Sequence, residues 1–244
     1  IDPLSDIQII NAELALSDLD ILEKNHQKLK KMQKTDDDKK KVSIIEKAIQ
    51  LISDEKKILG NLDKEEINYL NTYQLISTKP VVYICNVDEN SALSGNEFTK
   101  KIDTYSKENN SEVLLISAKI ESEISQITDF KDKQDFLESM GLKETGLKRV
   151  IKKGYEILNY INYFTAGEKE LRAWTITKGT LAPSAAGTIH SDMEKGFIRA
   201  ETISFNDYLS HKGEAGAKEK GKLRLEGKEY EVKDGDIMHF LFNV

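Results

Sequence analysis

The sequence predicts an α/β protein that carries an antiparallel helical hairpin and ends in a smaller α+β domain. Two apolar runs, 81–85 and 113–116, each end in polar residues and are separated by a helical pattern, as in a parallel, doubly wound sheet. Two amphipathic segments meet at an acidic turn near the start of the chain. After about residue 161, short β-rich runs alternate with turn signals. With 244 residues, 39% of them hydrophobic, the chain has enough apolar material for more than one core.

The hairpin is predicted from apolar residues spaced three, four or seven apart. The first segment runs from about residue 5 to 33, and the second starts at Val42. Between them lies the acidic turn Thr35 to Asp38, so the two helices should run antiparallel and pack in a coiled-coil manner.

Lysines surround this turn. A run of charge is often only a solvated helix face, and that interpretation stays open. The alternative is a contact with RNA phosphates or a ribosomal surface. The lysines of this tip are Lys28, Lys30, Lys31, Lys34, Lys39, Lys40 and Lys41.

The strand over 81–85 leads into a candidate base-reading loop. Asn86 is followed by Val87 and, three residues on, by Glu89, where P-loop GTPases have Asn-Lys-x-Asp. The longer carboxylate of Glu89 displaces the acceptor pair that guanine needs, so guanine selectivity should be lost. The amide of Asn86 offers both donors and an acceptor to adenine. Taken alone, these residues could equally form a solvated turn.

A second loop of this kind follows the strand over 113–116. It consists of Ser117, Ala118 and Lys119 and corresponds to the second base-contacting loop of the same nucleotide domain. Ligands bind at the carboxyl ends of the strands in such sheets.

The remaining pattern predicts helices over 96–109, 130–140 and 147–160, with Gly141 ending the second of them. Further on, strands are expected at 171–177, 223–225 and 238–244, and a helix opens near 182–191. Cys85 is expected to be a small buried hydrophobe, and Trp174 a core residue rather than an RNA-stacking platform. His190 next to Asp192 has no nucleophile at a recognisable spacing, so a structural role is favoured over catalysis.

Longer motifs carry a resemblance to a known family. They are Asp2-Pro3, Glu13 to Leu16, the loop from Asn86 to Glu89, and the stretches 163–199 and 217–244. Along essentially the whole chain, the sequence resembles the YchF family, the Obg-related, ribosome-associated NTPases that prefer ATP.

The resemblance implies a domain plan. Residues 1–12 would be a remnant of the P-loop nucleotide domain, 13–65 the inserted hairpin, 66–160 the base-recognition half, and 161–244 a β-grasp TGS domain. It also implies Mg²⁺-dependent ATP hydrolysis in the intact protein and the ribosome as partner. The alternatives are a non-catalytic ribosome- or RNA-binding module, and a tRNA-directed regulator suggested by fold analogy alone.

The sequence departs from the family in its phosphate-binding motifs. It contains neither Gly-x-x-x-x-Gly-Lys-Ser/Thr nor Asp-x-x-Gly, whose backbone and side chains would hold phosphates and Mg²⁺. We therefore expect a fragment of a larger protein with no catalytic residue, no metal ligand and no tightly bound ATP of its own.

Composition sets the remaining expectations. The net charge of −6 gives no global attraction to nucleic acid, and a single cysteine cannot form an internal disulfide. No apolar run is long enough for a membrane span and no leader pattern is seen, so a cytoplasmic protein without membrane contact is expected. Its oligomeric state stays open.

Overall fold

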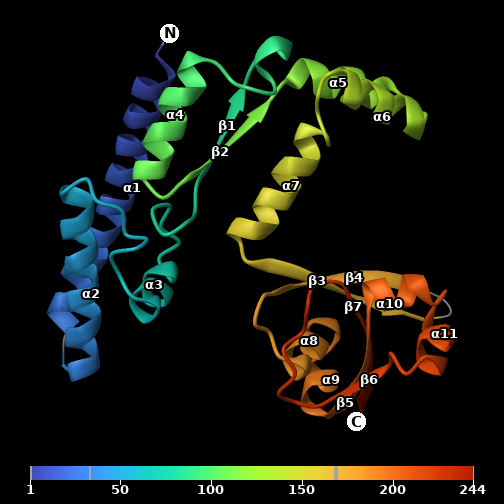
Figure 1. The fold of residues 1–244 in the computed structure, drawn as a ribbon. Helices are drawn as coiled ribbons and strands as arrows, with labels where there is room; N and C mark the ends of the chain where they lie inside the picture. The colour runs from blue at the N-terminus through green and yellow to red at the C-terminus, as the bar shows by residue number, and fades with distance from the viewer. Residues whose placement is uncertain (1, 33, 168–169, 244) are drawn as a thin grey trace. The chain divides into compact units, whose positions relative to one another are not determined.

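The structure, a computed structural model, describes residues 2–32, 34–167 and 170–243. It divides into two compact units, Ile1–Val150 and Ile151–Val244. Figure 1 traces both along the chain, and each is described separately below.

The first unit opens with two long helices, α1 (Pro3–Met32) and α2 (Asp36–Ser53). Both amphipathic helices predicted from the apolar periodicity are therefore present. Thr35 caps α2 because its hydroxyl accepts from Asp38 N at 3.1 Å, while the Asp38 carboxylate accepts from Thr35 N at 2.9 Å. Leu22 of α1 packs in one fully buried cluster with Ile45 and Ala48 of α2. The same cluster takes in Leu70 of the short helix α3 (Lys64–Asn71).

Polar side chains of α1 make hydrogen bonds to later segments of this unit. Asp18 is 1% exposed, and its carboxylate accepts from Ile76 N at 3.0 Å, from Ser77 N at 2.7 Å and from the Ser77 hydroxyl. About two turns earlier in α1, Asn11 Nδ2 donates to the hydroxyls of Tyr83 and Tyr105 at 3.0 and 3.2 Å. The buried carboxylate of Asp18 and the half-buried amide of Asn11 thus both have hydrogen-bond partners.

The strands of this unit are β1 (Val82–Asn86) and β2 (Glu112–Ile116), which pair in parallel. They lie within one residue of the predicted ranges, and helix α4 (Glu97–Glu108) connects them through the 3₁₀ turn η1 (Glu89–Ser91). After β2 come α5 (Ala118–Gln126), α6 (Phe130–Ser139) and α7 (Gly146–Ile157).

Two details of this region differ from the prediction. Ala118 and Lys119, predicted to lie in a loop, form the first turn of helix α5. The helix expected to reach residue 160 ends at Ile157, because Asn159 has a φ of +56° and Tyr160 already begins a strand. A left-handed residue cannot continue an α-helix.

The second unit is a five-stranded mixed sheet in the order β4-β3-β7-β5-β6. Its strands are β3 (Tyr160–Ala166), β4 (Leu171–Thr177), β5 (Phe197–Ser204), β6 (Arg224–Glu226) and β7 (Asp236–Phe242). Strand β3 runs parallel to β7, and the other pairs are antiparallel. The prediction found β4, β6 and β7 but missed β3 and β5. The helices are α8 (Ala182–Ile189), α9 (Ser191–Lys195), α10 (Phe205–Ser210) and α11 (Glu214–Glu219).

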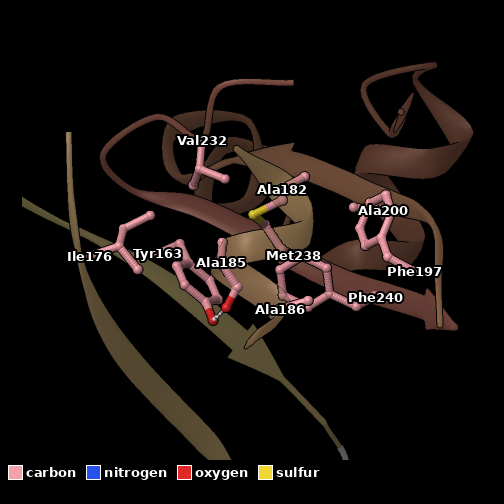
Figure 2. Packing of buried hydrophobic residues seen from close by; sticks show 10 residues of the cluster. All are labelled: Tyr163, Ile176, Ala182, Ala185, Ala186, Phe197, Ala200, Val232, Met238 and Phe240. Carbon is pink, nitrogen blue, oxygen red and sulfur yellow. Dashed lines mark hydrogen bonds between the residues drawn. The ribbon is translucent and has the colours of Figure 1, made fainter. Parts of the chain in front are cut away.

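One face of this sheet packs on α8, and Figure 2 shows the resulting core. Tyr163 lies at its centre, fully buried, with its hydroxyl donating to Ala185 O at 2.8 Å. Burial raises the pKa of Tyr163 to about 12. Trp174, predicted as a core residue, is half-buried and packs at the margin of this core, with Arg172 over its ring at 4.3 Å.

A buried carboxylate holds the turn before β7. Asp236 is 2% exposed and accepts from the Tyr230 hydroxyl at 2.7 Å and from Lys233 N at 2.9 Å. Arg224 Nη2 lies 3.5 Å from the same carboxylate. The short loop between β6 and β7 is therefore fixed by a charge-assisted network.

Candidate nucleotide-base site

The two predicted base loops start side by side. Strands β1 and β2 are in parallel register with Asn86 opposite Ile116, so the segments that follow leave the same edge of the sheet. The site residues predicted from sequence on these two segments are thus brought together by the structure.

A hydrogen bond ties the loops to each other. Asn86 Oδ1 accepts from Ala118 N at 3.0 Å, and this N–H is one of the unpaired donors at the start of α5. The oxygen assignment is forced because only an acceptor can face a backbone N–H. Asn86 is exposed, and its Nδ2 donors have no partner among the described residues, so they are the atoms left for a ligand.

The backbone of Val87 is partly engaged. Its N–H donates to Ile116 O at 2.8 Å, which extends the pairing of the strands by one residue. Only its carbonyl and its half-buried side chain remain to face a base. On the opposite loop, Ser117 is 4% exposed, and its hydroxyl lacks a partner among the described atoms. That hydroxyl is a polar group for which the protein supplies no hydrogen bond.

Glu89 and Lys119 form an ion pair across the mouth of the two loops. The hydrogen bond from Lys119 lowers the pKa of Glu89, and the same contact raises the pKa of Lys119. Asp88, one residue earlier, caps the turn η1 by accepting from Ser91 N at 2.9 Å. Both carboxylates of this loop therefore have partners within the protein.

Sequence reasoning did not foresee the ion pair, although a signal existed. Glu89 lies three residues beyond Asn86 and Lys119 three residues beyond Ile116, and these two residues are opposite each other in the parallel register. Opposite charges at matching distances from paired strand ends are close enough to meet.

The lysines at the tip of the α1–α2 pair divide into two sets. Three of them form ion pairs: Lys39 with Asp36 at 2.7 Å, Lys40 with Glu65 at 2.9 Å and Lys41 with Asp37 at 2.5 Å. The other four are exposed and have no ion pair among the described residues. These four are Lys28, Lys30, Lys31 and Lys34.

Other candidates play local roles. His190 Nδ1 accepts from Asp192 N at 3.2 Å and so caps α9, in line with the structural role favoured for it. Cys85 is buried, as predicted, and burial raises its thiol pKa. Within the described part of the chain, no group of three or more metal-ligating side chains occurs. Nor is any described helix long and apolar enough to cross a membrane.

Comparison with known proteins identifies relatives along the whole chain. The YchF-GTPase_C family model, described as a protein of unknown function (DUF933), matches residues 160–243. "Ribosome-binding ATPase YchF" from Haemophilus ducreyi is 47% identical over 247 residues, covering 100% of this chain and 68% of that protein. The protein of the same name from Bacillus subtilis is 45% identical over 249 residues, with the same coverage.

A solved structure agrees. The Schizosaccharomyces pombe YchF GTPase is 33% identical with a TM-score of 0.88, covering 99% of this chain and 66% of that one. A GTP-binding protein from Pyrococcus horikoshii, 17% identical with a TM-score of 0.61, shares the fold. The chain spans about two thirds of the length of these YchF proteins. It belongs to the YchF family.

Proposed function

We propose that this chain supplies the purine-base site of an ATP-preferring, ribosome-associated NTPase. The observation that carries the proposal is the closed arrangement of the two loops, in which Asn86 bridges to Ala118 and Lys119 engages Glu89. The names of the relatives, ribosome-binding ATPases, support the same activity.

The geometry favours adenine over guanine. Guanine presents two adjacent donors on its Watson–Crick edge and needs a free carboxylate opposite them. Because Lys119 engages one oxygen of the Glu89 carboxylate, the two oxygens are no longer both free for guanine's two donors, and a donor left without an acceptor costs about 1–3 kcal/mol. Adenine has ring nitrogen acceptors, which suit the free Nδ2 donors of Asn86. The orphan hydroxyl of Ser117 is a further group that a bound base or water could satisfy.

In this proposal, residues outside this chain bind the phosphates and Mg²⁺. The sequence holds no Gly-rich phosphate loop, and the described residues hold no cluster of metal ligands. In the longer proteins of the family, ATP hydrolysis would therefore use phosphate-binding residues outside this chain. The chain's own residues bind and orient the base.

The test is a titration of the chain with adenosine, followed by amide chemical shifts. Adenosine lacks phosphates, so a missing phosphate loop does not affect the result. We expect shifts at residues 86–89 and 117–119, and their loss in Asn86→Ala. Asn61→Ala is the matched control, because Asn61 is an exposed asparagine with one local hydrogen bond, to Lys57 O at 2.8 Å. Unchanged shifts in Asn86→Ala would refute the site.

A second candidate function, contact with ribosomal RNA, is favoured by the lysines of the α1–α2 tip. The four lysines without ion pairs lie on the last turns of α1 and just after it, where the helix dipole also favours cations. Phosphates would meet them as point charges. The three paired lysines are already neutralised by Asp36, Asp37 and Glu65.

This division gives a matched pair of variants for co-sedimentation with ribosomes across a salt series. Changing the four unpaired lysines to Gln should weaken binding and lower its salt dependence. Changing the paired set to Gln should have a much smaller effect. Equal effects of both sets would contradict the proposed division between paired and unpaired lysines, and binding insensitive to both would remove the tip from the interface.

Within this proposal the α1–α2 pair is a coiled-coil hairpin and the second unit a β-grasp domain of the TGS type. The mixed sheet with β3 parallel to β7 and α8 packed on one face supports the second assignment. Such a domain would act in interaction or regulation rather than catalysis.

A further inference from the structure

Strand β4 forms one edge of the five-stranded sheet, and its outer side is unpaired. Lys178 N donates to Asn159 O at 2.8 Å and Gly167 N to Glu170 O at 3.0 Å, which fixes the alternation of the β3–β4 ladder. Even-numbered residues of β4 bond to β3, so odd-numbered residues direct their N–H and C=O groups outward. Among the described residues, nothing bonds to these groups of Leu171, Ala173 and Thr175.

The edge lacks the features that usually prevent pairing. It is seven residues long, its register with β3 has no bulge, and it contains neither Pro nor Lys. Leu171, a large apolar residue, is 77% exposed. The only charged side chain of the strand, Arg172, is stacked on Trp174. Such an edge is a template for another strand.

We propose that the edge pairs with β4 of a second copy of this chain, antiparallel and centred on Ala173. In this register Ala173 faces Ala173, and Leu171 faces Thr175 of the other copy. The three outward residues of each copy then form the hydrogen-bonded pairs, so all six free N–H groups and all six free C=O groups are matched. No other register centred on this strand does this, because Thr177 O is already taken by Thr180.

The side chains agree with this register. Arg172 comes to lie opposite Trp174 of the second copy, in the closer, non-hydrogen-bonded type of pair, where a cation and an aromatic ring attract each other. No like charges face each other in the paired segment from Leu171 to Thr175.

Sedimentation velocity of the chain over a concentration series tests the proposal. A strand-to-strand contact buries little surface, so we expect a weak dimer with a dissociation constant in the range of ~10–100 µM. Ala173→Lys and Ala173→Glu should each weaken it at least about tenfold, because like charges then face each other across the symmetry axis. Mixing the two variants should restore the dimer.

Leu225→Lys is the matched control. Leu225 is 57% exposed on β6, the opposite edge of the same sheet, and its substitution should leave the dimer unchanged. The proposal is overturned if the chain remains monomeric up to about 1 mM, far above the expected dissociation constant. It is also overturned if both Ala173 variants associate like the parent chain, or if their mixture fails to recover the dimer while each is folded by circular dichroism.

Discussion

Asp18 is a buried carboxylate whose replacement by Asn should destabilise the first unit. Its Oδ1 accepts from Ile76 N at 3.0 Å, and its Oδ2 accepts from Ser77 N at 2.7 Å and from the Ser77 hydroxyl. All three partners are donors. An Asn side chain keeps one acceptor oxygen for Ser77, but its NH₂ group then faces the N–H of Ile76, and two donors cannot bond.

The size of the effect follows from these contacts. A hydrogen bond to a charged group contributes about 1.5–3 kcal/mol, and a buried donor left unsatisfied costs about 1–3 kcal/mol. Asp18→Asn loses the hydrogen bond from Ile76 N and leaves this N–H buried without an acceptor. We therefore expect the free energy of unfolding of this unit to fall by about 3 kcal/mol. With a urea dependence of about 2 kcal/mol per molar, the midpoint should fall by about 1–2 M.

The chain offers an internal control for the assay. Its one tryptophan, Trp174, lies in the second unit, whereas the long helices α1 and α2 of the first dominate the helical signal. Asp18→Asn should shift urea unfolding followed by circular dichroism at 222 nm and leave the Trp174 fluorescence transition in place. Asp20→Asn, on the exposed side of the same helix, should change stability by less than about 0.5 kcal/mol. A shift for Asp18→Asn no larger than this control would refute the reasoning.

Three further predictions concern individual groups. Asp236→Asn should lower the free energy of unfolding of the second unit by about 2–3 kcal/mol, because it breaks a buried charge-assisted network. The urea midpoint followed by Trp174 fluorescence should fall, and the midpoint followed by circular dichroism at 222 nm should not change. The carboxyl of Glu89 has a folded-state pKa below its ordinary value, so its ion pair is present at neutral pH and is lost as the pH falls through that lowered value. In Lys119→Met, the pKa of Glu89 measured by NMR should return toward the ordinary range. Cys85 should react with a thiol reagent far more slowly than a free thiol, because burial both shields it and raises its pKa, and a fast reaction of the folded chain would contradict its buried position.

The elements that could be predicted from the sequence are those whose local pattern agrees with their surroundings. Helices α1 and α2 follow from the spacing of their apolar residues, and β1 ends at Asn86, one residue beyond the predicted run. The β-rich run from Leu171 to Thr177, followed by the turn signal Lys178-Gly179, predicts strand β4 with its observed bounds.

The missed elements depend on long-range contacts. Strand β3 follows a helix with only two residues between, and its central Tyr163 is buried through contacts with Ala185 and Phe240, distant in sequence. Strand β5 contains Arg199 and Glu201 among its apolar residues, which hides its alternation. In both cases tertiary packing outweighs the local pattern.

For the candidate site, the sequence predicts two segments that follow neighbouring strands, but it predicts neither the hydrogen bond between them nor the start of α5 at Ala118. That Asn86 and Ala118 meet follows from the parallel register, which a sequence read one segment at a time does not contain. The difference between paired and unpaired tip lysines also depends on a contact between distant segments, because Lys40 pairs with Glu65, 25 residues away.

The most direct test of the account is the ratio of the dissociation constants of adenosine and guanosine for this chain, measured from the amide shifts of residues 86–89 and 117–119. With Glu89 held by Lys119, we predict that guanosine binds at least about tenfold more weakly, the equivalent of one unsatisfied donor in the site. Equal binding of the two nucleosides at these residues, or no response of these amides to adenosine, would contradict the claim that the two loops form an adenine-selective base site.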